Sequence, residues 1–185
     1  MLVTVRTRQD WKPAQHIYLH APKESIGGHP FTVCNISRPL DQSNNARPYE
    51  STQELLIRVR GGATKQLYKK AIGGRDEEST TRAKSPNWQA AEAVPIEAWS
   101  EGPYGHEKFL GEDYNTLVLI AAGSGVSYCL SNALDIVRRA RAMHQNPKEI
   151  RSIAVATKRL SFIWVVKKPG KSLTSYRQFM NLTSV

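Results

Sequence analysis

Cysteine is scarce in this sequence, and its two copies are far apart. Among 185 residues only Cys34 and Cys129 are cysteines, without a C-x-x-C pair or a histidine cluster near either of them. Two isolated thiols do not make the disulfide framework of a small secreted domain or the four-ligand set of a structural zinc site. We therefore expect a chain that folds around an apolar core in a reducing compartment.

Long hydrophobic runs are also missing. The longest apolar stretch, residues 117–130, is interrupted by glycines and serines, and it falls short of the roughly 20 residues that a membrane-spanning helix needs. The N-terminal sequence MLVTVRTRQDW lacks the apolar centre of a signal peptide. The sequence itself therefore predicts no transmembrane segment.

Acidic residues are fewer than basic residues, 16 against 26, which gives a formal net charge of +10. This charge favours anionic partners, namely nucleotide phosphates, nucleic acid or an anionic membrane surface. A basic nucleic-acid-binding module is the weakest of these readings, because no RNA-binding or helix-turn-helix pattern is present, and we expect no nucleic-acid partner. The G-x-S-x-G and H-E-x-x-H signatures of hydrolases are missing too, so we assign no catalytic side chain and no metal site.

The first hundred residues carry short β-type segments that are separated by turn-rich polar stretches. No window shows a convincing 3.6-residue periodicity, so we expect no long helix here. Polar loops occupy residues 37–52 and 73–93. The pattern predicts a small antiparallel β-barrel over residues 1–105. The candidate strands are 2–6, 16–20, 30–36, 55–60 and 95–100.

After Tyr114 the pattern changes to α/β. An apolar run at 117–122 leads through glycines into a segment with one apolar helical face, which comprises Leu130, Ala133, Leu134 and Val137. A second apolar run, 162–166, has apolar residues on both faces, as in a buried parallel strand. We predict an incomplete Rossmann-like βαβ unit over 114–168, because two strands fall short of the usual five or six. Residues 169–185 read as a polar tail.

Gly123-Ser124-Gly125 stands where the apolar run meets the helical segment. Glycines allow a phosphate to approach the backbone, and the free amides and dipole of a helix N-terminus favour negative charge. A glycine-rich turn without a ligand has the same sequence, so the short motif alone is weak. Its position between strand and helix is what favours a nucleotide site.

Three further motifs are compatible with binding and with ordinary structure. H-P-F-T at 29–32 begins a strand, Arg58 and Arg60 share a strand face before a glycine turn, and E-G-P-Y-G at 101–105 closes a strand. Two arginines on one face suit a diphosphate. Taken singly, H-P-F-T is better explained as an edge strand and E-G-P-Y-G as a turn between domains, whereas the two arginines fit a solvated basic face equally well.

The order of the motifs resembles a known family. The resemblance rests on W-K-P-A-Q-H at 11–16, H-P-F-T, R-x-G-x-T at 60–64, E-G-P-Y-G, then L-I-A-A-G-S-G-V-S at 119–127 and F-I-W-V-V-K at 162–167. This series is similar to the flavin- and NADPH-binding region of fungal ferric-chelate reductases and NADPH oxidases, in the ferredoxin–NADP reductase superfamily. It covers residues 3–167, and the ordered series is more specific than any single motif.

The resemblance implies FAD and NADPH as cofactors. The implied binding residues are His29, Pro30, Phe31 and Thr32 for the flavin ring and ribityl chain, Arg60, Gly62 and Thr64 for the FAD diphosphate, Gly102, Pro103 and Tyr104 near the nicotinamide, and Gly123, Ser124, Gly125 and Val126 for the NADPH diphosphate. Lys167 is basic where an NAD enzyme usually carries an acid for the ribose hydroxyls, which favours NADPH.

Some family features are replaced or not visible. The family glycine in W-x-P-G-Q-H is Ala14 here, and the glycine before G-S-G is Ala122. Family members also carry a haem-binding transmembrane bundle, a first barrel strand and a second half of the nucleotide domain. We see none of these, and we expect the chain to be truncated at both ends.

The resemblance implies a flavoprotein reductase module that passes electrons from NADPH through FAD, as in the ferric-chelate reductases of iron transport. It places the module at the cytosolic face of a membrane, with a haem-containing transmembrane domain or subunit as partner, and a soluble acceptor as a further option. The alternative is an inactive truncated remnant, in which the 162–166 strand is an exposed hydrophobic edge. The two hypotheses differ in whether the chain holds FAD.

Overall fold

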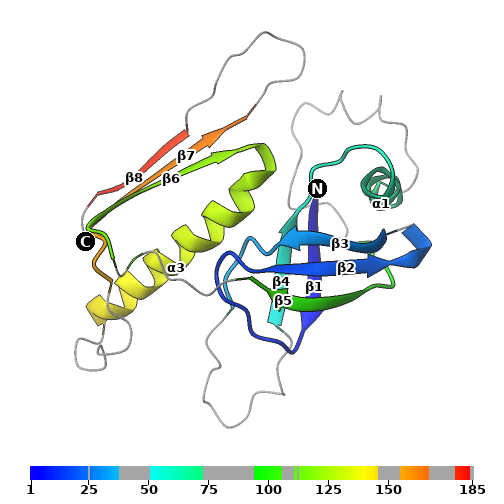
Figure 1. Cartoon of the computed structure of the whole chain (residues 1–185), viewed down its shortest axis with the longest axis horizontal. Helices are drawn as coiled ribbons and strands as arrows, with labels where there is room; N and C mark the ends of the chain where they lie inside the picture. Colours follow the sequence, from blue (N-terminus) through cyan, green and yellow to red (C-terminus); the bar gives the residue numbers. More distant parts are fainter. Residues whose placement is uncertain are drawn as a thin grey trace.

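The computed structural model of the chain describes residues 1–24, 26–37, 51–72, 94–105, 111, 113–145, 155–166 and 178–183. Its helices and strands form two units that lie side by side (Figure 1). The first unit comprises the described residues up to 105, and the second unit those from 111 onward. Within the described ranges no helix is both long enough and apolar enough to cross a membrane.

The first unit consists of two small antiparallel sheets. Strand β1 (Leu2–Thr7) pairs with β4 (Ser51–Leu56). In the second sheet β2 (His16–Ala21) lies between β3 (Ile26–Thr32) and β5 (Trp99–Tyr104). A bridge between Val33 and Leu55 joins the sheets. The antiparallel β architecture is as predicted, and among the described strands no closed ring is recorded.

Several strands are displaced from their predicted positions. Strand β3 begins four residues before the predicted 30–36, and β4 occupies 51–56 in place of 55–60. Strand β5 occupies 99–104 in place of 95–100. The sequence did not predict the first part of β3, because the glycines and the proline of the I-G-G-H-P stretch have low β-propensity. In the structure, pairing with β2 overrides this low propensity.

A helix that the sequence did not predict, α1 (Ala63–Ala71), follows the glycine turn at 61–62. Of its nine residues only Leu67 is buried. One core-facing residue gives no periodic apolar pattern, so a helix this short escapes a search for 3.6-residue spacing. The Lys70 ammonium pairs with the buried carboxylate of Glu24, in the 3-10 turn η1 (Pro22–Glu24), which ties α1 to the sheet.

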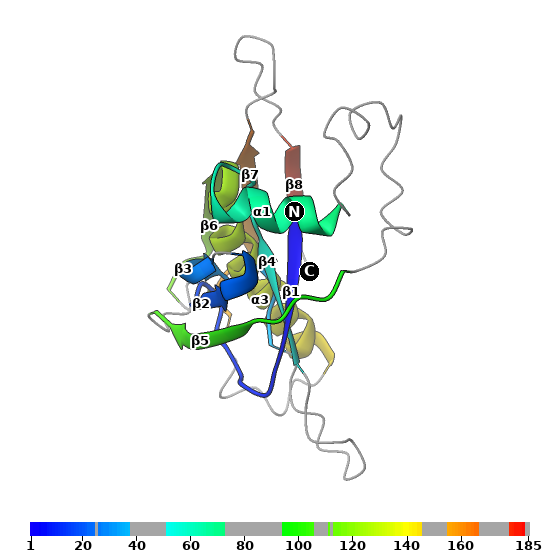
Figure 2. The same cartoon turned by 90° about the vertical axis from the view of Figure 1, so that its right-hand side faces the viewer.

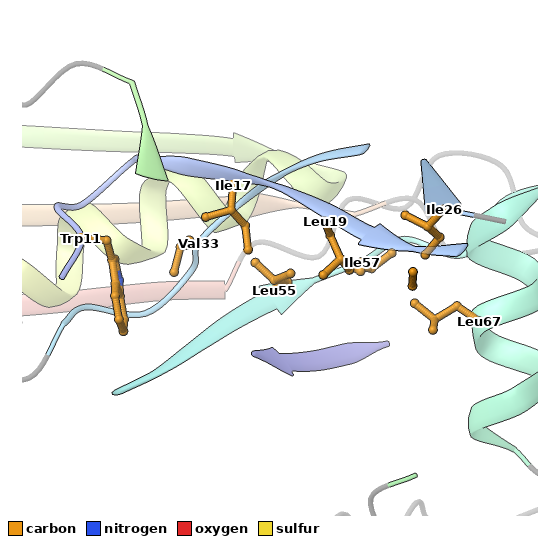
Figure 3. Close-up of a cluster of buried hydrophobic side chains, with 9 residues drawn as sticks. Trp11, Ile17, Leu19, Ile26, Val33, Leu55, Ile57 and Leu67 are labelled. Atoms are coloured by element: carbon orange, nitrogen blue, oxygen red, sulfur yellow. The ribbon is translucent and has the colours of Figure 1, made fainter. Parts of the chain in front are cut away.

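Alternating residues of the strands build the core of the first unit (Figure 3). On β2 the inward residues Ile17 and Leu19 are almost fully buried, while Tyr18 between them faces outward. Burial of each large apolar side chain stabilises the fold by roughly 1.5–3 kcal/mol. This first core comprises Trp11, Ile17, Leu19, Ala21, Ile26, Val33, Leu55, Ile57 and Leu67.

The second unit is a three-stranded sheet with one long helix. Strand β6 (Thr116–Ala122) runs parallel to β7 (Arg159–Val165), as predicted for a βαβ unit. A third strand, β8 (Gln178–Thr183), pairs antiparallel with β7. The sequence predicts two strands here and a polar tail beyond 168, so β8 corrects that expectation. Because β7 is central, the predicted exposed edge at 162–166 is also wrong.

Helix α3 (Val126–Gln145) lies between this sheet and the first unit, as the two views agree (Figures 1 and 2). The turn η3 (Gly123–Gly125) joins it to β6. Its sheet-facing stripe differs from the predicted one, since Leu134 is 39% exposed whereas Ile136 is buried. The second core comprises Leu119, Ala121, Val126, Cys129, Ile136 and Leu160.

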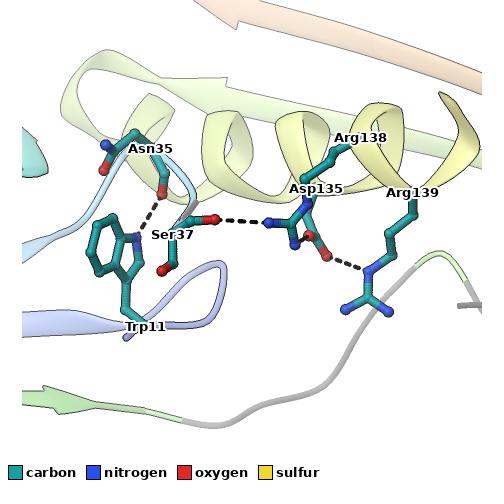
Figure 4. Close-up of polar contacts among 6 residues, drawn as sticks. All are labelled: Trp11, Asn35, Ser37, Asp135, Arg138 and Arg139. Carbon is teal, nitrogen blue, oxygen red and sulfur yellow. Dashed lines mark hydrogen bonds and ion pairs between the residues drawn. The ribbon is translucent and has the colours of Figure 1, made fainter. Parts of the chain in front are cut away.

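The other side of α3 is polar and holds the two units together (Figure 4). Ser131 Oγ accepts a hydrogen bond from the backbone N–H of Ala14 at 3.0 Å, and Arg138 Nη1 donates to the carbonyl of Ser37 at 2.8 Å. The carboxylate of Asp135 is fully buried and pairs with Arg138 and Arg139. Both arginines lie inside the helix, and Arg138 makes the contact with the first unit.

We predict that Asp135→Asn lowers the free energy of unfolding by about 2 kcal/mol, because the buried carboxylate is the acceptor for two guanidinium groups. The measurement is urea unfolding followed by circular dichroism. The matched control is Glu97→Gln, which removes a carboxylate that is 76% exposed and pairs with Lys23 at 2.6 Å. It changes stability by less than about 0.5 kcal/mol. Equal losses in both variants would contradict the role given to Asp135.

Candidate nucleotide-binding site

The chain that leaves β4 touches both cores. Ile57 is part of the first core, whereas its neighbour Leu56 packs against the second core. The Ile57 N–H donates to the carbonyl of Met1 at 2.9 Å, so the extended pairing continues one residue beyond β4. With two-residue alternation, the side chain of Arg58 follows on the side of Leu56 and faces the second unit. Both arginines are exposed.

Arg58 extends to the glycine turn of the second unit. Its Nη1 lies 3.8 Å from the position that a Cβ on Gly123 would occupy. Arg60 belongs to the other turn, since its backbone N–H donates to Thr64 Oγ1 at 3.0 Å. Within the part of the chain that the structure describes, neither arginine has a carboxylate at ion-pair distance.

The turn before α1 leaves room for a ligand. The carbonyl of Gly62 accepts the N–H groups of Lys65 and Gln66 at 3.1 Å, which begins the helix. Thr64 Oγ1 also donates to the carbonyl of Gly61 at 3.3 Å. A Cβ added at Gly61 or Gly62 would meet nothing within 4 Å. The turn therefore presents backbone and open space beside Arg60, which suits a phosphate.

The turn before α3 has the same character. Gly123 has a φ of 55°, in the region that favours glycine, and Gly125 has open space where a Cβ would stand. The Trp164 indole N–H donates to the Gly123 carbonyl at 3.0 Å and holds the turn. The side chain of Ser124 is exposed while Val126 is buried. The four predicted residues of this turn are thus together, with Val126 as its apolar anchor.

The H-P-F-T motif lies on β3, and its four residues divide between two faces. Phe31 stands opposite Ile17 and packs against the first core, whereas His29, which stands opposite Leu19, is exposed. Pro30 and Thr32 stand opposite Tyr18 and His16, on the outer face. The contact of all four residues with a flavin stays a prediction.

Gly102, Pro103 and Tyr104 form the end of β5. The Gly102–Pro103 peptide bond is cis. The ring of Tyr104 lies 5.7 Å from that of Tyr18 and 6.1 Å from that of His16, and Tyr104 is 47% exposed. The motif therefore contributes an exposed aromatic group on the outer face that Pro30 and Thr32 share.

The turn at 12–15 connects β5 with α3. Gln15 Nε2 donates to the carbonyl of Gly105 at 3.3 Å, and the Ala14 N–H donates to Ser131 on α3. Ala14 has a φ of 67°, a conformation that is strained for alanine. This is the position where the family motif has glycine. Ala122, the other departure, has an extended φ of −122°, so its methyl group causes no backbone strain.

Both cysteines are buried. Burial, together with the charge of Glu54, raises the pKa of the Cys34 thiol from its ordinary value of 9.0 to about 11. Burial also raises the pKa of the Cys129 thiol, whose Sγ lies 3.7 Å from the carbonyl oxygen of Ile120. Neither thiol has the depressed pKa of a nucleophilic cysteine.

Sequence reasoning missed two residues of this region and named one that lies outside the described part of the chain. Trp164 reads from the sequence as a buried strand residue, and nothing in the pattern signals its bond to Gly123. Arg58 was grouped with Arg60, and only the structure separates their directions. Lys167 lies outside the described residues, so its contact with a nucleotide stays a prediction.

Two protein-family models match the chain. The model described as an FAD-binding domain matches residues 2–108, more than half of the chain. The model described as the ferric reductase NAD binding domain matches residues 114–184. It therefore includes β8, beyond the boundary at 168 that the sequence predicts.

Two fungal ferric reductases match most of this chain, but the matched region is only a small part of their own length. A probable cell surface ferric reductase of Aspergillus oryzae is 27% identical over 174 residues, which cover 90% of this chain and 19% of that protein. The ferric reductase transmembrane component 1 of Schizosaccharomyces pombe is 26% identical over 159 residues, 72% of this chain and 26% of that protein. The chain thus spans about a fifth to a quarter of these relatives. Among solved structures, the ferredoxin reductase in carbazole 1,9a-dioxygenase covers 91% of this chain and 38% of its own, with 17% identity and a TM-score of 0.45.

We predict that Ala14→Gly raises the free energy of unfolding by about 1 kcal/mol, because glycine relieves the positive φ at this position. The matched control is Ala122→Gly, the second position where glycine is usual in the family. Its extended backbone gives glycine no advantage, so the variant lowers stability by about 0.5 kcal/mol. Urea unfolding measures both. If both variants were more stable, or both less stable, the positive φ of Ala14 would not be the cause of the change in stability.

We also predict slow alkylation of Cys34 by iodoacetamide at about pH 8, where a pKa of about 11 leaves roughly one thiol in a thousand ionised. Intact mass spectrometry, with and without guanidinium, measures the labelling. Folding raises the pKa of this thiol, so its contribution to stability is present below pH 9.0 and is lost as the pH rises toward about 11. Rapid labelling of the folded chain would contradict the burial of this thiol.

Proposed function

This chain belongs to the ferric reductase family, with an FAD-binding domain followed by a NAD-binding domain, and we propose that it works as a flavoprotein reductase module that passes electrons from NADPH through FAD. One observation carries the proposal. Two open glycine turns, each at the start of a helix, have one exposed arginine apiece, and both arginines follow the same strand. Two neighbouring phosphate sites suit two dinucleotides in adjacent positions.

The residues around the α1 turn fit the diphosphate of FAD. Open backbone at Gly62 admits a phosphate oxygen, and Arg60 supplies positive charge beside it. The early amides of a helix have no intrahelical acceptor and add hydrogen-bond donors. We propose that the H-P-F-T motif of β3, residues His29, Pro30, Phe31 and Thr32, holds the flavin side of the same cofactor.

The residues around the α3 turn fit the diphosphate of a nicotinamide nucleotide. The glycines at 123 and 125 keep side chains out of the approach to the helix N-terminus, and Ser124 adds an exposed hydroxyl. Bound FAD supplies the conversion of a two-electron hydride into single electrons. The protein side chains then need only bind, orient and shield the cofactors.

We propose NADPH as the electron donor. Lys167 and Lys168 follow β7, the strand next to β6, where dinucleotide-binding folds discriminate the ribose 2′-hydroxyl from a 2′-phosphate. A basic side chain at this place favours the extra phosphate. The formal net charge of +10 acts in the same direction over longer distances.

We propose a haem-containing membrane domain or subunit as the physiological acceptor, which places the module at the cytosolic face of a membrane. The proposal is supported by two relatives, which are described as a probable cell surface ferric reductase and as a ferric reductase transmembrane component. Transfer to ferric iron and a role in iron transport belong to the same proposal.

The test is a titration of the purified 185-residue chain with FAD, followed by flavin absorbance and fluorescence. NADPH is then added without oxygen, and loss of the oxidised flavin band is recorded. We expect saturable FAD binding and bleaching that needs less NADPH than NADH. Flavin binding without bleaching would contradict the reductase role. A folded chain that binds no FAD would overturn the proposal and favour the inactive remnant.

A single substitution tests the proposed preference for NADPH over NADH. We predict that Lys167→Ala weakens NADPH binding about tenfold and leaves NADH binding unchanged, because one charge contact with the 2′-phosphate is lost. The matched control is Lys158→Ala, an exposed lysine just before the beginning of β7, at the other end of the strand. Equal effects of both variants, or equal losses for both nucleotides, would reject the role given to Lys167.

A further inference from the structure

We propose that His20 is a positioning residue that sets the spacing between two motifs, H-P-F-T on β3 and G-P-Y at the end of β5. The family resemblance places these motifs at the flavin and near the nicotinamide, and it gives His20 no role. The His20 side chain lies against Gly28, just before the first motif, and contacts Glu101, just before the second. The inference rests on the proposed function and deepens it.

The contact of His20 with β3 depends on a bulge in that strand. The pairing of β2 with β3 shifts after Leu19, which stands opposite His29. His20 therefore stands opposite Gly27, and Gly28 is the extra residue of the bulge, with a φ of 73°. A Cβ on Gly28 would lie 2.9 Å from Cε1 of the His20 ring. The ring thus fills the space of a side chain at position 28, directly before the H-P-F-T motif.

On the other side of β2, the same ring contacts two exposed residues of β5. It is stacked on the indole of Trp99, with the ring centroids 5.1 Å apart and an angle of 4° between the planes. Its Nε2 lies 3.0 Å from Oε1 of Glu101. Because β2 lies between β3 and β5 in the sheet, one imidazole links the backbone of β3 with side chains of β5 (Figure 1).

The contact between His20 and Glu101 depends on the charge of the imidazole. Nε2 is shielded from water, and within the described residues it makes no hydrogen bond of ordinary geometry. Its attraction to the carboxylate is therefore that of an ion pair, which needs a protonated ring. A protonated ring also gains a cation–π contact with Trp99. Histidine loses its proton between about pH 5 and 8, so the link to β5 weakens as the pH rises through that range.

Other charged groups near His20 do not take the place of Glu101. Among the residues that the structure describes, Glu101 is the acid at ion-pair distance from His20. The two charged residues of η1, the turn that follows β2, have partners of their own. The other titratable or charged side chains on the elements packed against His20 are His29 on β3, Tyr104 on β5, His16 and Tyr18 on β2, and Lys23 and Glu24 in η1.

The link to β5 lies beside an irregular part of the ladder. The pairing shifts before Tyr18, and as a result one residue of β2 faces both Gly102 and Pro103. These two residues are held by contacts on either side of them. Beyond them, the ring of Tyr104 lies 5.7 Å from that of Tyr18, and before them stands the contact with His20. Loss of the His20 contact therefore lets Gly102 and Pro103 shift relative to the H-P-F-T motif.

Such a shift acts on the proposed reaction more than on binding. Transfer between two bound rings needs reacting atoms about 3–3.5 Å apart, and a displacement of about 1 Å costs on the order of 100-fold in rate. The proposed diphosphate sites lie at the turns before α1 and α3, on other elements than β3 and β5. We therefore expect His20 to affect the rate of flavin reduction and to leave the affinity for both nucleotides nearly unchanged.

The experiment compares four variants of the full chain. His20→Gln removes the ring, Glu101→Gln removes the carboxylate, and a double variant combines the two. Because the Glu101 side chain is 54% exposed, its substitution leaves the core intact. The matched control is Lys23→Gln, which breaks an exposed ion pair between the turn after β2 and Glu97, just before β5.

The first measurement is hydrogen exchange of the cofactor-free chain at pH 6, followed by mass spectrometry. We expect exchange over residues 99–105 to be about tenfold faster in the three variants of the pair, with β1 and β4 unchanged. Lys23→Gln matches the unsubstituted chain.

The second measurement is the rate of flavin bleaching by saturating NADPH without oxygen, at pH 6 and pH 8, together with the affinities for FAD and NADP⁺. We expect bleaching at pH 6 to be about tenfold slower in the variants of the pair, with both affinities changed by less than about twofold. The unsubstituted chain becomes slower from pH 6 to pH 8, and the variants lose this change. The double variant is no slower than either single variant, because all three remove the same contact.

Four results would overturn the inference. Unchanged exchange over residues 99–105 would show that His20 does not hold β5. Equal bleaching rates in all variants would remove His20 from the reaction while leaving the proposed function intact. A loss of FAD affinity as large as the loss of rate would make His20 a structural residue, and equal slowing in Lys23→Gln would make the effect one of general charge. If the unsubstituted chain binds no FAD, the proposed function fails together with the inference.

Discussion

The alternation of residues along β4 is the constraint on which the arrangement of the two units depends. Leu56, at the end of β4, packs against the second core, and the next residue, Ile57, belongs to the first core. The units therefore cannot separate without exposing apolar surface on both sides of this segment. The polar contacts of α3 act beside this strand, because Ser131 and Arg138 bond to backbone groups of the first unit. Apolar burial thus sets the distance between the units, while the directional hydrogen bonds fix their orientation. Both glycine turns are positioned by these contacts.

The strand-to-helix turn at 123–126 was predictable from the sequence, because an apolar strand, two glycines and an amphipathic helix are all local patterns. Helix α1 was not, since its single buried residue, Leu67, leaves no periodic signal. Strand β8 was not either, because pairing with the central β7 is a long-range contact that composition does not encode. The same limit applies to the site. Its glycines are visible in the sequence, whereas the bond from Trp164 to Gly123 and the direction of Arg58 depend on tertiary contacts.

The two alanines at usual glycine positions show why a motif has to be translated into backbone geometry. Ala122 has an extended backbone, so a methyl group is compatible with its conformation. Ala14 has a positive φ and is held there by its own N–H bond to Ser131 and by the Gln15 bond to Gly105. The contact between α3 and the first unit therefore maintains a strained residue. One departure from the family pattern is neutral, and the other stores strain at the junction of the units.

Charge at the junction bears on the proposed binding of two anionic cofactors. Under that proposal two diphosphates would lie on neighbouring turns, where they would repel each other. The exposed arginines after β4 have no carboxylate partner among the described residues, whereas Arg138 and Arg139 share the single negative charge of Asp135. The chain thus uses the same residue type in two ways. Arginines on α3 pair with a buried acid and join the units. Those after β4 are exposed near the open turns, where positive charge would lower the cost of the proposed binding of two nucleotides.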